Sequence, residues 1–277
     1  MGAGIAIVAA RAGFTVRVFD VSSEAIDRAR GQTADFLEKS VARGKLSPSD
    51  RDTTLARLTG STRIADLADC EFVIEAIYEN LAAKHELLGQ LDQACPPETI
   101  FASNTSTISI TEIAAGSGRA DRFVGMHFCL PAQLMKLVEM SPGLNTSEET
   151  WTDAWAFCEA LGQKPVATSD TPGFVLNYFL IPYHNDAIRL VEQGVASTAD
   201  IDIAMKAAMG YPMGPFELLD LVGADTQKLL CDAMFGLTNE KRAACPPLIR
   251  RMIAAGHLGK KSGRGFHHYD DSKMFGA

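Results

Sequence analysis

The sequence begins with residues 1–20, MGAGIAIVAARAGFTVRVFD, and this stretch decides the fold class. Residues 1–10 are small or aliphatic, which is typical of a helix that packs closely against a sheet, and Gly13 predicts where that helix ends. Residues 14–20 then alternate apolar and polar side chains, as a strand does, and end on Asp20. A buried helix followed by a strand is one repeat of a layered α/β protein.

The alternation of helices and strands continues through the first part of the chain. Strands are expected over residues 61–64, 72–77, 99–103, 123–127, 137–140 and 166–168, and helices over residues 23–46, 78–91 and 147–161. This order predicts a mostly parallel sheet with helices on both faces. Ligands of such sheets bind beyond the carboxyl ends of the strands, where Asp20, Glu79 and Ser106 fall.

Beyond Asp170 the strand signals stop and the chain becomes helical. Helices are expected over residues 174–192, 198–209, 214–234 and 246–255, and a glycine-rich basic loop over residues 259–266. We therefore predict an α/β domain over residues 1–169 and an all-helical domain over residues 170–277.

Composition narrows the function classes. The chain has 277 residues, 47% of them hydrophobic, and a net charge of −8 without a basic stripe, which argues against nucleic-acid and membrane-surface partners. The six cysteines show neither CxxC nor paired Cys/His spacing, so we expect no metal site and a reduced, cytoplasmic setting. No apolar run reaches the length of a membrane span, and no basic segment of a signal peptide opens the sequence.

Residues 103–140 carry the candidate chemistry. His127 ends one apolar strand-like run and Glu139 lies inside the next, so a chain that turns back between them can place the carboxylate beside the imidazole. Such a carboxylate fixes the tautomer, raises imidazole basicity and leaves the other ring nitrogen to accept a proton. Ser106 could hold a substrate oxygen nearby. The alternative is a satisfied core histidine, a solvated glutamate and a Ser/Thr cluster that caps a helix.

The first residues also match part of a dinucleotide-binding fold. In that fold a strand precedes GxGxxG, a helix follows, and a second strand ends in an acid that binds the ribose hydroxyls. Here the helix, the second strand and Asp20 are present, Gly2 stands for the third glycine, and the first strand and two glycines are not seen. Asp20 favours NAD over NADP, because a carboxylate repels a 2′-phosphate. The alternatives are a close-packed helix at Gly2 and a helix cap at Asp20.

Segments along the whole chain together resemble a known family. They are MGAGIA at residues 1–6, EAIYENL at 75–81, FASNTSTISITEIA at 101–114, RFVGMHF at 122–128, MKLVEM at 135–140, DTPGFVLN at 170–177, GYPMGPFELLDLVGADT at 210–226 and LGKKSGRGF at 258–266. In these segments the chain resembles L-3-hydroxyacyl-CoA dehydrogenases of the 3-hydroxybutyryl-CoA dehydrogenase type. The fold that this resemblance implies is a Rossmann-type, mostly parallel sheet followed by an all-helical domain.

The resemblance also implies roles for individual residues. His127 would take the proton of the 3-hydroxyl group while hydride passes to NAD, and Glu139 would orient that histidine. Ser106 and Asn177 would hydrogen-bond the substrate oxygen, with Ser106 also against the nicotinamide. Cofactor contacts would come from Gly2, Asp20, Glu79, Lys84 and Lys261, and Arg43, with Lys45 nearby, would meet the CoA moiety of the acyl-CoA substrate. The helical domain would form the interface of a homodimer.

For several of these positions a plainer interpretation stays open. Arg43 and Lys45 are also the residues expected where a helix ends, and Asn177 is typical of a solvent-facing or capping position. Two other functions also stay open. One is a CoA-independent hydroxy-acid dehydrogenase of the L-gulonate type, and the other is a non-catalytic acyl-CoA-binding dimer.

The sequence departs from the family pattern at two places. The family begins with a strand and the full glycine motif, so about a dozen residues that form them are not found before Met1. We expect a chain extended upstream to be more stable, to bind NAD better and to be more active. The second departure is HFCLP at residues 127–131, where the family usually has HFFNP. Cys129 and Leu130 therefore leave the fine substrate and cofactor preference open.

Overall fold

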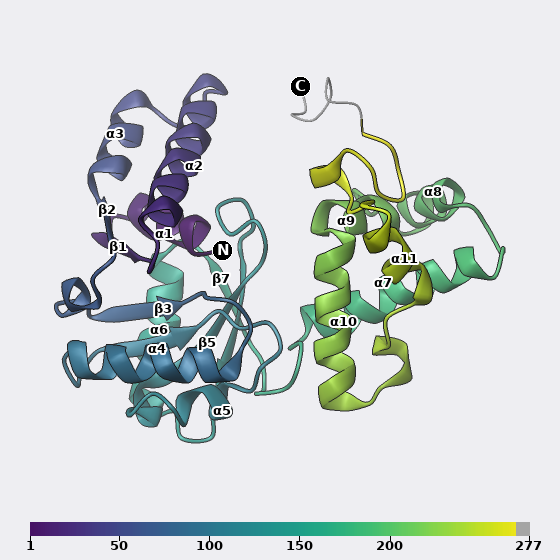
Figure 1. The fold of residues 1–277 in the computed structure, drawn as a ribbon. Helices are drawn as coiled ribbons and strands as arrows, with labels where there is room; N and C mark the ends of the chain where they lie inside the picture. Colours follow the sequence, from purple (N-terminus) through teal and green to yellow (C-terminus); the bar gives the residue numbers. More distant parts are fainter. Residues whose placement is uncertain (270–277) are drawn as a thin grey trace. The chain divides into compact units, whose positions relative to one another are not determined.

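The computed structural model describes residues 1–269 and divides into two compact units, Met1–Thr171 and Pro172–Ala277 (Figure 1). The mixed α/β class predicted from the sequence is confirmed. In the first unit the helices and strands, in chain order, are α1 Gly2–Arg11, β1 Val16–Phe19, α2 Ser23–Ala42, α3 Pro48–Ala56, β2 Leu58–Ser61, β3 Phe72–Glu75, α4 Leu81–Ala94, β4 Ile100–Ser103, α5 Ile110–Ala114, β5 Phe123–Phe128, β6 Leu137–Pro142, α6 Glu148–Ala160 and β7 Lys164–Ala167.

The strands of the first unit form two sheets. Five strands lie in the order β3-β4-β5-β6-β7, and every neighbouring pair is parallel except β5 and β6. β1 pairs in parallel with β2 in a separate two-stranded sheet. Within residues 1–269, no strand pairs with the second edge of β1 or of β3. The predicted mostly parallel arrangement is confirmed, but it is divided in two between β1 and β3.

The two faces of the five-stranded sheet carry different side chains. Alternate residues of β4, β5 and β6 join one apolar cluster with α1 and α6. The residues between them, including His127 and Glu139, point to the opposite face. There α5 lies very close to β5, because a Cβ atom at Gly125 would come 2.6 Å from the Cδ1 atom of Ile110. Glycine at this position lets α5 cover the face on which His127 lies.

The close approach predicted for the first helix occurs at Gly4 and not at Gly2. A Cβ atom at Gly4 would come 2.7 Å from Gln133 Oε1 and 3.3 Å from Ala132 Cβ. A Cβ atom at Gly2 would meet nothing within 4 Å. The small residues of α1 therefore let it pack on the segment after β5, and space stays open at its N-terminus.

The second unit is helical, as predicted, over its described residues. It contains α7 Leu176–Glu192, α8 Thr198–Met209, α9 Pro215–Val222, α10 Ala224–Thr238 and α11 Pro247–Ala254. The prediction of a single helix over residues 214–234 is wrong, because this segment forms α9 and α10. The helix breaks at Gly223, whose φ of 100° lies in the region that side-chain-bearing residues rarely adopt.

Other predicted boundaries are also corrected. The helix expected to reach Leu46 ends at Ala42, and α3 was not foreseen. The strand expected over residues 61–64 lies at β2. The helix expected from Tyr78 begins at Leu81, because the side chain of Asn80 accepts a hydrogen bond from the backbone N–H of Ala83 and caps α4.

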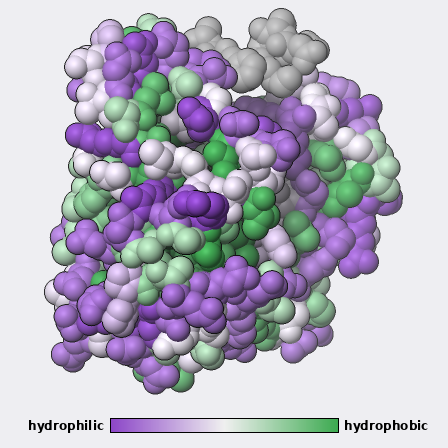
Figure 2. All heavy atoms as spheres, turned by 60° about the vertical axis from the view of Figure 1, so that its left-hand side comes forward, coloured by the Kyte–Doolittle hydropathy of each residue, from purple (hydrophilic) through white to green (hydrophobic). Residues whose placement is uncertain are grey.

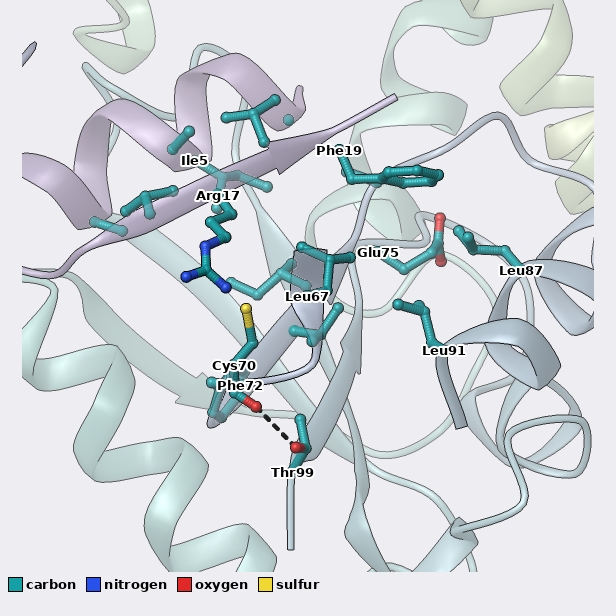
Figure 3. A pocket seen from close by; sticks show the side chains of 18 of the residues that line it. Ile5, Arg17, Phe19, Leu67, Cys70, Phe72, Glu75, Leu87, Leu91 and Thr99 are labelled. Atoms are coloured by element: carbon teal, nitrogen blue, oxygen red, sulfur yellow. Dashed lines mark hydrogen bonds between the residues drawn. The ribbon is translucent and has the colours of Figure 1, made fainter. Parts of the chain in front are cut away.

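A groove of about 1520 Å³ runs between β1 and β3. Figure 3 shows side chains that line it from α1 (Ile5), from β1 (Phe19) and from α4 (Leu87 and Leu91). Figure 2 shows apolar residues between polar ones on the face that it presents. The groove thus joins two unpaired strand edges to a largely apolar lining, which is the environment of a buried central strand.

This environment predicts the effect of filling the groove. A strand-forming segment of about six β-branched residues, joined before Met1, should raise the free energy of unfolding by several kcal/mol, because it would pair its backbone and bury apolar surface. Urea unfolding and calorimetry would measure the change. As a control, the same segment with alternate prolines cannot donate the ladder hydrogen bonds. Equal stability of the original and both extended chains would contradict the prediction.

Candidate active site

The strand register places the two central residues opposite each other. In the antiparallel pair of β5 and β6, His127 stands directly across from Glu139, so both side chains lie on one face. His127 Nδ1 is 2.8 Å from Glu139 Oε2. Only 7% of His127 and 1% of Glu139 is exposed, so the alternative of a solvated glutamate is wrong. The predicted pairing of imidazole and carboxylate is confirmed.

The third member of the site is Ser106. Its hydroxyl oxygen lies 3.2 Å from the other ring nitrogen of His127, Nε2. A carboxylate can only accept, so we assign the ring proton to Nδ1, which leaves Nε2 as the acceptor. The serine hydroxyl can donate to that nitrogen, and a substrate hydroxyl could occupy the same place.

Two residues that the sequence analysis did not single out fix the segment around Ser106. The side-chain oxygen of Asn104 accepts a hydrogen bond of 2.9 Å from the backbone N–H of Phe128, which ties the end of β4 to the end of β5. The carboxylate of Asp170 accepts from the backbone N–H groups of Ile110 (2.7 Å) and Thr111 (2.9 Å) at the start of α5. A polar residue just after a strand was the only signal for Asn104. Asp170 carried no local signal.

Lys84, a cofactor contact in the sequence analysis, is buried within the first unit. Its ammonium nitrogen lies 2.7 and 2.9 Å from the two oxygens of Glu75 and 3.3 Å from Glu79 Oε2, with 1% of the side chain exposed. The hydroxyl of Ser103 donates to Glu75 at 2.7 Å. Removing one partner of such a buried ion pair typically costs about 3–5 kcal/mol. Within the unit, Lys84 is therefore part of an ionic network with Glu75 and Glu79. The contact of Lys84 with the cofactor stays a prediction.

Asp20 and Gly2 both lie on the groove between β1 and β3. Asp20 Oδ1 accepts a hydrogen bond from the backbone N–H of Ser22 at 3.0 Å, while Ser22 itself caps α2. The residue that caps α2 is therefore Ser22 and not Asp20. Arg43 and Lys45 are exposed just beyond the end of α2, and their contact with CoA stays a prediction.

The remaining predicted residues belong to the second unit. Asn177 is a buried residue of the first turn of α7. Lys261 Nζ lies 2.5 and 2.7 Å from the two carboxylate oxygens of Asp225. These contacts describe each residue within its own unit, so the substrate role of Asn177 and the cofactor role of Lys261 stay predictions.

The family departures next to His127 have different environments. Burial raises the pKa of the Cys129 thiol to about 11, with a smaller contribution from the charge of Glu139, so the thiol is neutral near pH 7. Leu130, by contrast, is 62% exposed. Among residues 1–269 no helix is long and apolar enough to cross a membrane, and no cluster of three potential metal ligands was found.

A mostly parallel α/β unit with an acid after β1, and a histidine–carboxylate pair that can take the proton of an alcohol, fit a dehydrogenase of the dinucleotide-dependent class. Comparison with family models makes this specific. Residues 1–171 match the NAD-binding domain of 3-hydroxyacyl-CoA dehydrogenase, and residues 173–269 match its C-terminal domain. The chain belongs to the 3-hydroxyacyl-CoA dehydrogenase family, which confirms the predicted family and NAD as the predicted cofactor.

Individual relatives are similar over nearly their whole length. A probable 3-hydroxybutyryl-CoA dehydrogenase of Bacillus subtilis is 45% identical over 272 residues, which cover 98% of this chain and 94% of the relative. A 3-hydroxybutyryl-CoA dehydrogenase of Mycobacterium tuberculosis is 44% identical, with 97% and 95% covered. The crystal structure of Mycobacterium tuberculosis FadB2 has a TM-score of 0.95 at 43% identity, covering 98% of this chain and 95% of that chain.

Proposed function

We propose that the protein interconverts short-chain L-3-hydroxyacyl-CoA and 3-oxoacyl-CoA by hydride transfer to and from NAD. The observation that carries this proposal is the imidazole of His127 held between Glu139 Oε2, at 2.8 Å, and Ser106 Oγ, at 3.2 Å. Alcohol oxidation requires a base for the hydroxyl proton, and this arrangement presents one with its partner already in place.

The residues of the site divide the work as follows. Ser106 holds the substrate hydroxyl. The proton of that substrate hydroxyl passes to Nε2 of His127. The resulting imidazolium is stabilised by Glu139, which accepts from Nδ1 throughout. NAD, when bound, supplies the acceptor for the hydride that leaves C3. In the reverse direction His127 returns the proton to the carbonyl oxygen. We propose Asn177 as a second partner of that oxygen.

The end of the groove beyond β1 fits the adenosine end of NAD, and the length alongside β1 and β3 stays available to a strand. Asp20 lies on it at the end of β1, where a carboxylate binds ribose hydroxyls and disfavours a 2′-phosphate. The N-terminus of α1 also lies on it, and the open space at Gly2 leaves room for a ligand near that helix end. We propose Lys84 and Lys261 as further cofactor contacts, and Arg43 and Lys45 as contacts of the CoA phosphates.

Substrate choice tests the proposal directly. With NADH, acetoacetyl-CoA should be reduced with a kcat/KM at least about a hundredfold above free acetoacetate, because binding energy from the remote CoA moiety is used at the reacting carbon. Comparable rates with free acids, or L-gulonate oxidation that exceeds both, would favour the CoA-independent alternative. Absence of turnover together with absence of NADH binding by fluorescence would favour the non-catalytic binding protein.

The base assignment has its own prediction. The variant His127→Gln should lower kcat by about 10²–10⁴-fold, because glutamine cannot take the substrate proton. NADH binding, followed by fluorescence, should be unchanged. His268→Gln, which changes an exposed histidine of the second unit, is the matched control and should keep the original rate. A rate near that of the original chain in His127→Gln would remove His127 from the mechanism.

We further propose that the second unit forms the interface of a homodimer. Large apolar side chains on its helices and loops are more than half exposed, and an interface that covered them would remove apolar surface from water. They are Tyr178, Phe179, Val195, Ile203, Met209, Leu221, Leu229 and Leu237. Light scattering should therefore give about twice the chain mass of 29.8 kDa. A mass equal to that of one chain at micromolar concentration would contradict the proposal.

A further inference from the structure

The carboxylate of Glu79 holds the turn that carries Ser106. Glu79 lies between β3 and α4, far from Ser106 in the sequence. Its Oε1 atom accepts hydrogen bonds from the backbone N–H groups of Ser106 (2.6 Å) and Thr107 (3.1 Å) and from the hydroxyl of Thr105 (2.6 Å). The hydroxyl of Thr107 adds a longer hydrogen bond of 3.5 Å, so four donors of one turn converge on a single carboxylate oxygen.

The second carboxylate oxygen of Glu79 is held by a buried lysine. Glu79 Oε2 lies 3.3 Å from the ammonium of Lys84, which is buried and held in turn by Glu75. Hydrogen bonds that involve a charged group are stronger than hydrogen bonds between neutral groups. A buried cation, moreover, cannot move away without losing its partners. Glu79 therefore connects an immobile charge inside the unit to a turn at the carboxyl edge of the sheet.

The turn depends on such an anchor because it belongs to no helix or strand. It spans the interval between the end of β4 and the start of α5, where Asp170 binds the first backbone N–H groups. The hydroxyl of Thr105, which donates to Glu79, also accepts from the backbone N–H of Ile108 at 3.0 Å. Displacement of Glu79 would therefore remove the anchor of residues 105–107, while Asn104 and Asp170 still hold the two ends of the interval.

We propose that Glu79 is a positioning residue of the reaction, which holds Ser106 Oγ against Nε2 of His127 through the backbone of the turn. This inference rests on the proposed function, because Ser106 is the residue that orients the substrate hydroxyl. It differs from the cofactor contact expected of Glu79 from the family resemblance. A positioning residue acts through Ser106, so its effect disappears when the serine hydroxyl is absent.

A double-mutant cycle with Glu79→Gln and Ser106→Ala in the full chain tests this dependence. In Glu79→Gln a neutral amide replaces the carboxylate that faces Lys84, so the turn that carries Ser106 loses its charged anchor. This single change should lower kcat by about ten- to a hundredfold and alter the pH profile of kcat/KM. In the Ser106→Ala background the same change should lower kcat by less than about twofold. In both backgrounds, Glu79→Gln should change NADH affinity by less than about twofold.

Glu112→Gln, which changes an exposed glutamate of α5, is the matched control and should leave kcat unchanged. Glu79→Asp, which keeps the charge and retracts it by one methylene group, replaces the glutamine variant if that variant does not fold. Equal losses of kcat with and without the Ser106 hydroxyl would overturn the proposal. A fall in NADH affinity that accounts for the lost rate would overturn it too, because Glu79 would then act on the cofactor.

A readout without turnover separates this inference from the proposed function. The nitrogen NMR signal of His127 Nε2 reports its hydrogen bond to Ser106. Glu79→Gln should move this signal in the same direction as Ser106→Ala does. The signal of the double variant should lie where it lies in Ser106→Ala alone. An unmoved signal in Glu79→Gln would overturn the positioning role, whereas an inactive original chain with a moved signal would refute only the dehydrogenase activity.

Discussion

The hydrogen bond between His127 Nδ1 and Glu139 Oε2 is the interaction on which the site depends. It exists only in one strand register, because a slip of one residue would turn Glu139 to the other face of β6. The buried side chains of Val138 and Met140, which belong to the apolar cluster on that other face, prevent the slip. The apolar core therefore sets the strand register on which the polar pair depends.

The single antiparallel pair in the sheet has a structural reason. Parallel strands need a long crossover, whereas β5 and β6 follow each other directly, so residues close in sequence face each other across the pair. A second polar group, beyond the end of β3, joins the buried pair of Lys84 and Glu75 to the exposed Glu79. The turn after β4 touches both groups, through Glu79 on one side and His127 on the other. Polar residues inside the unit thus form one connected system.

The sequence predicted the parts of this system that follow a local period. Apolar alternation revealed β5 and β6, and their short connection implied the facing of His127 and Glu139. The break at Gly223 could not be predicted, since a glycine inside a helical pattern is often tolerated and only the surrounding structure imposes its positive φ. The burial of Lys84 was missed for a related reason. Its partner Glu75 comes from another element, and no local pattern records that contact.

The two sheets of the first unit divide the proposed work between them. The sheet that carries His127 and Glu139 is linked strand by strand from β3 to β7 and needs no pairing with β1. Asp20, in contrast, depends on the β1–β2 pair, whose other edge faces the groove. A strand placed in that groove would join the two sheets into one. Because the histidine–carboxylate pair is already held by its own sheet, such a strand would act mainly on the placement of Asp20, which we propose as the acid that binds the cofactor ribose.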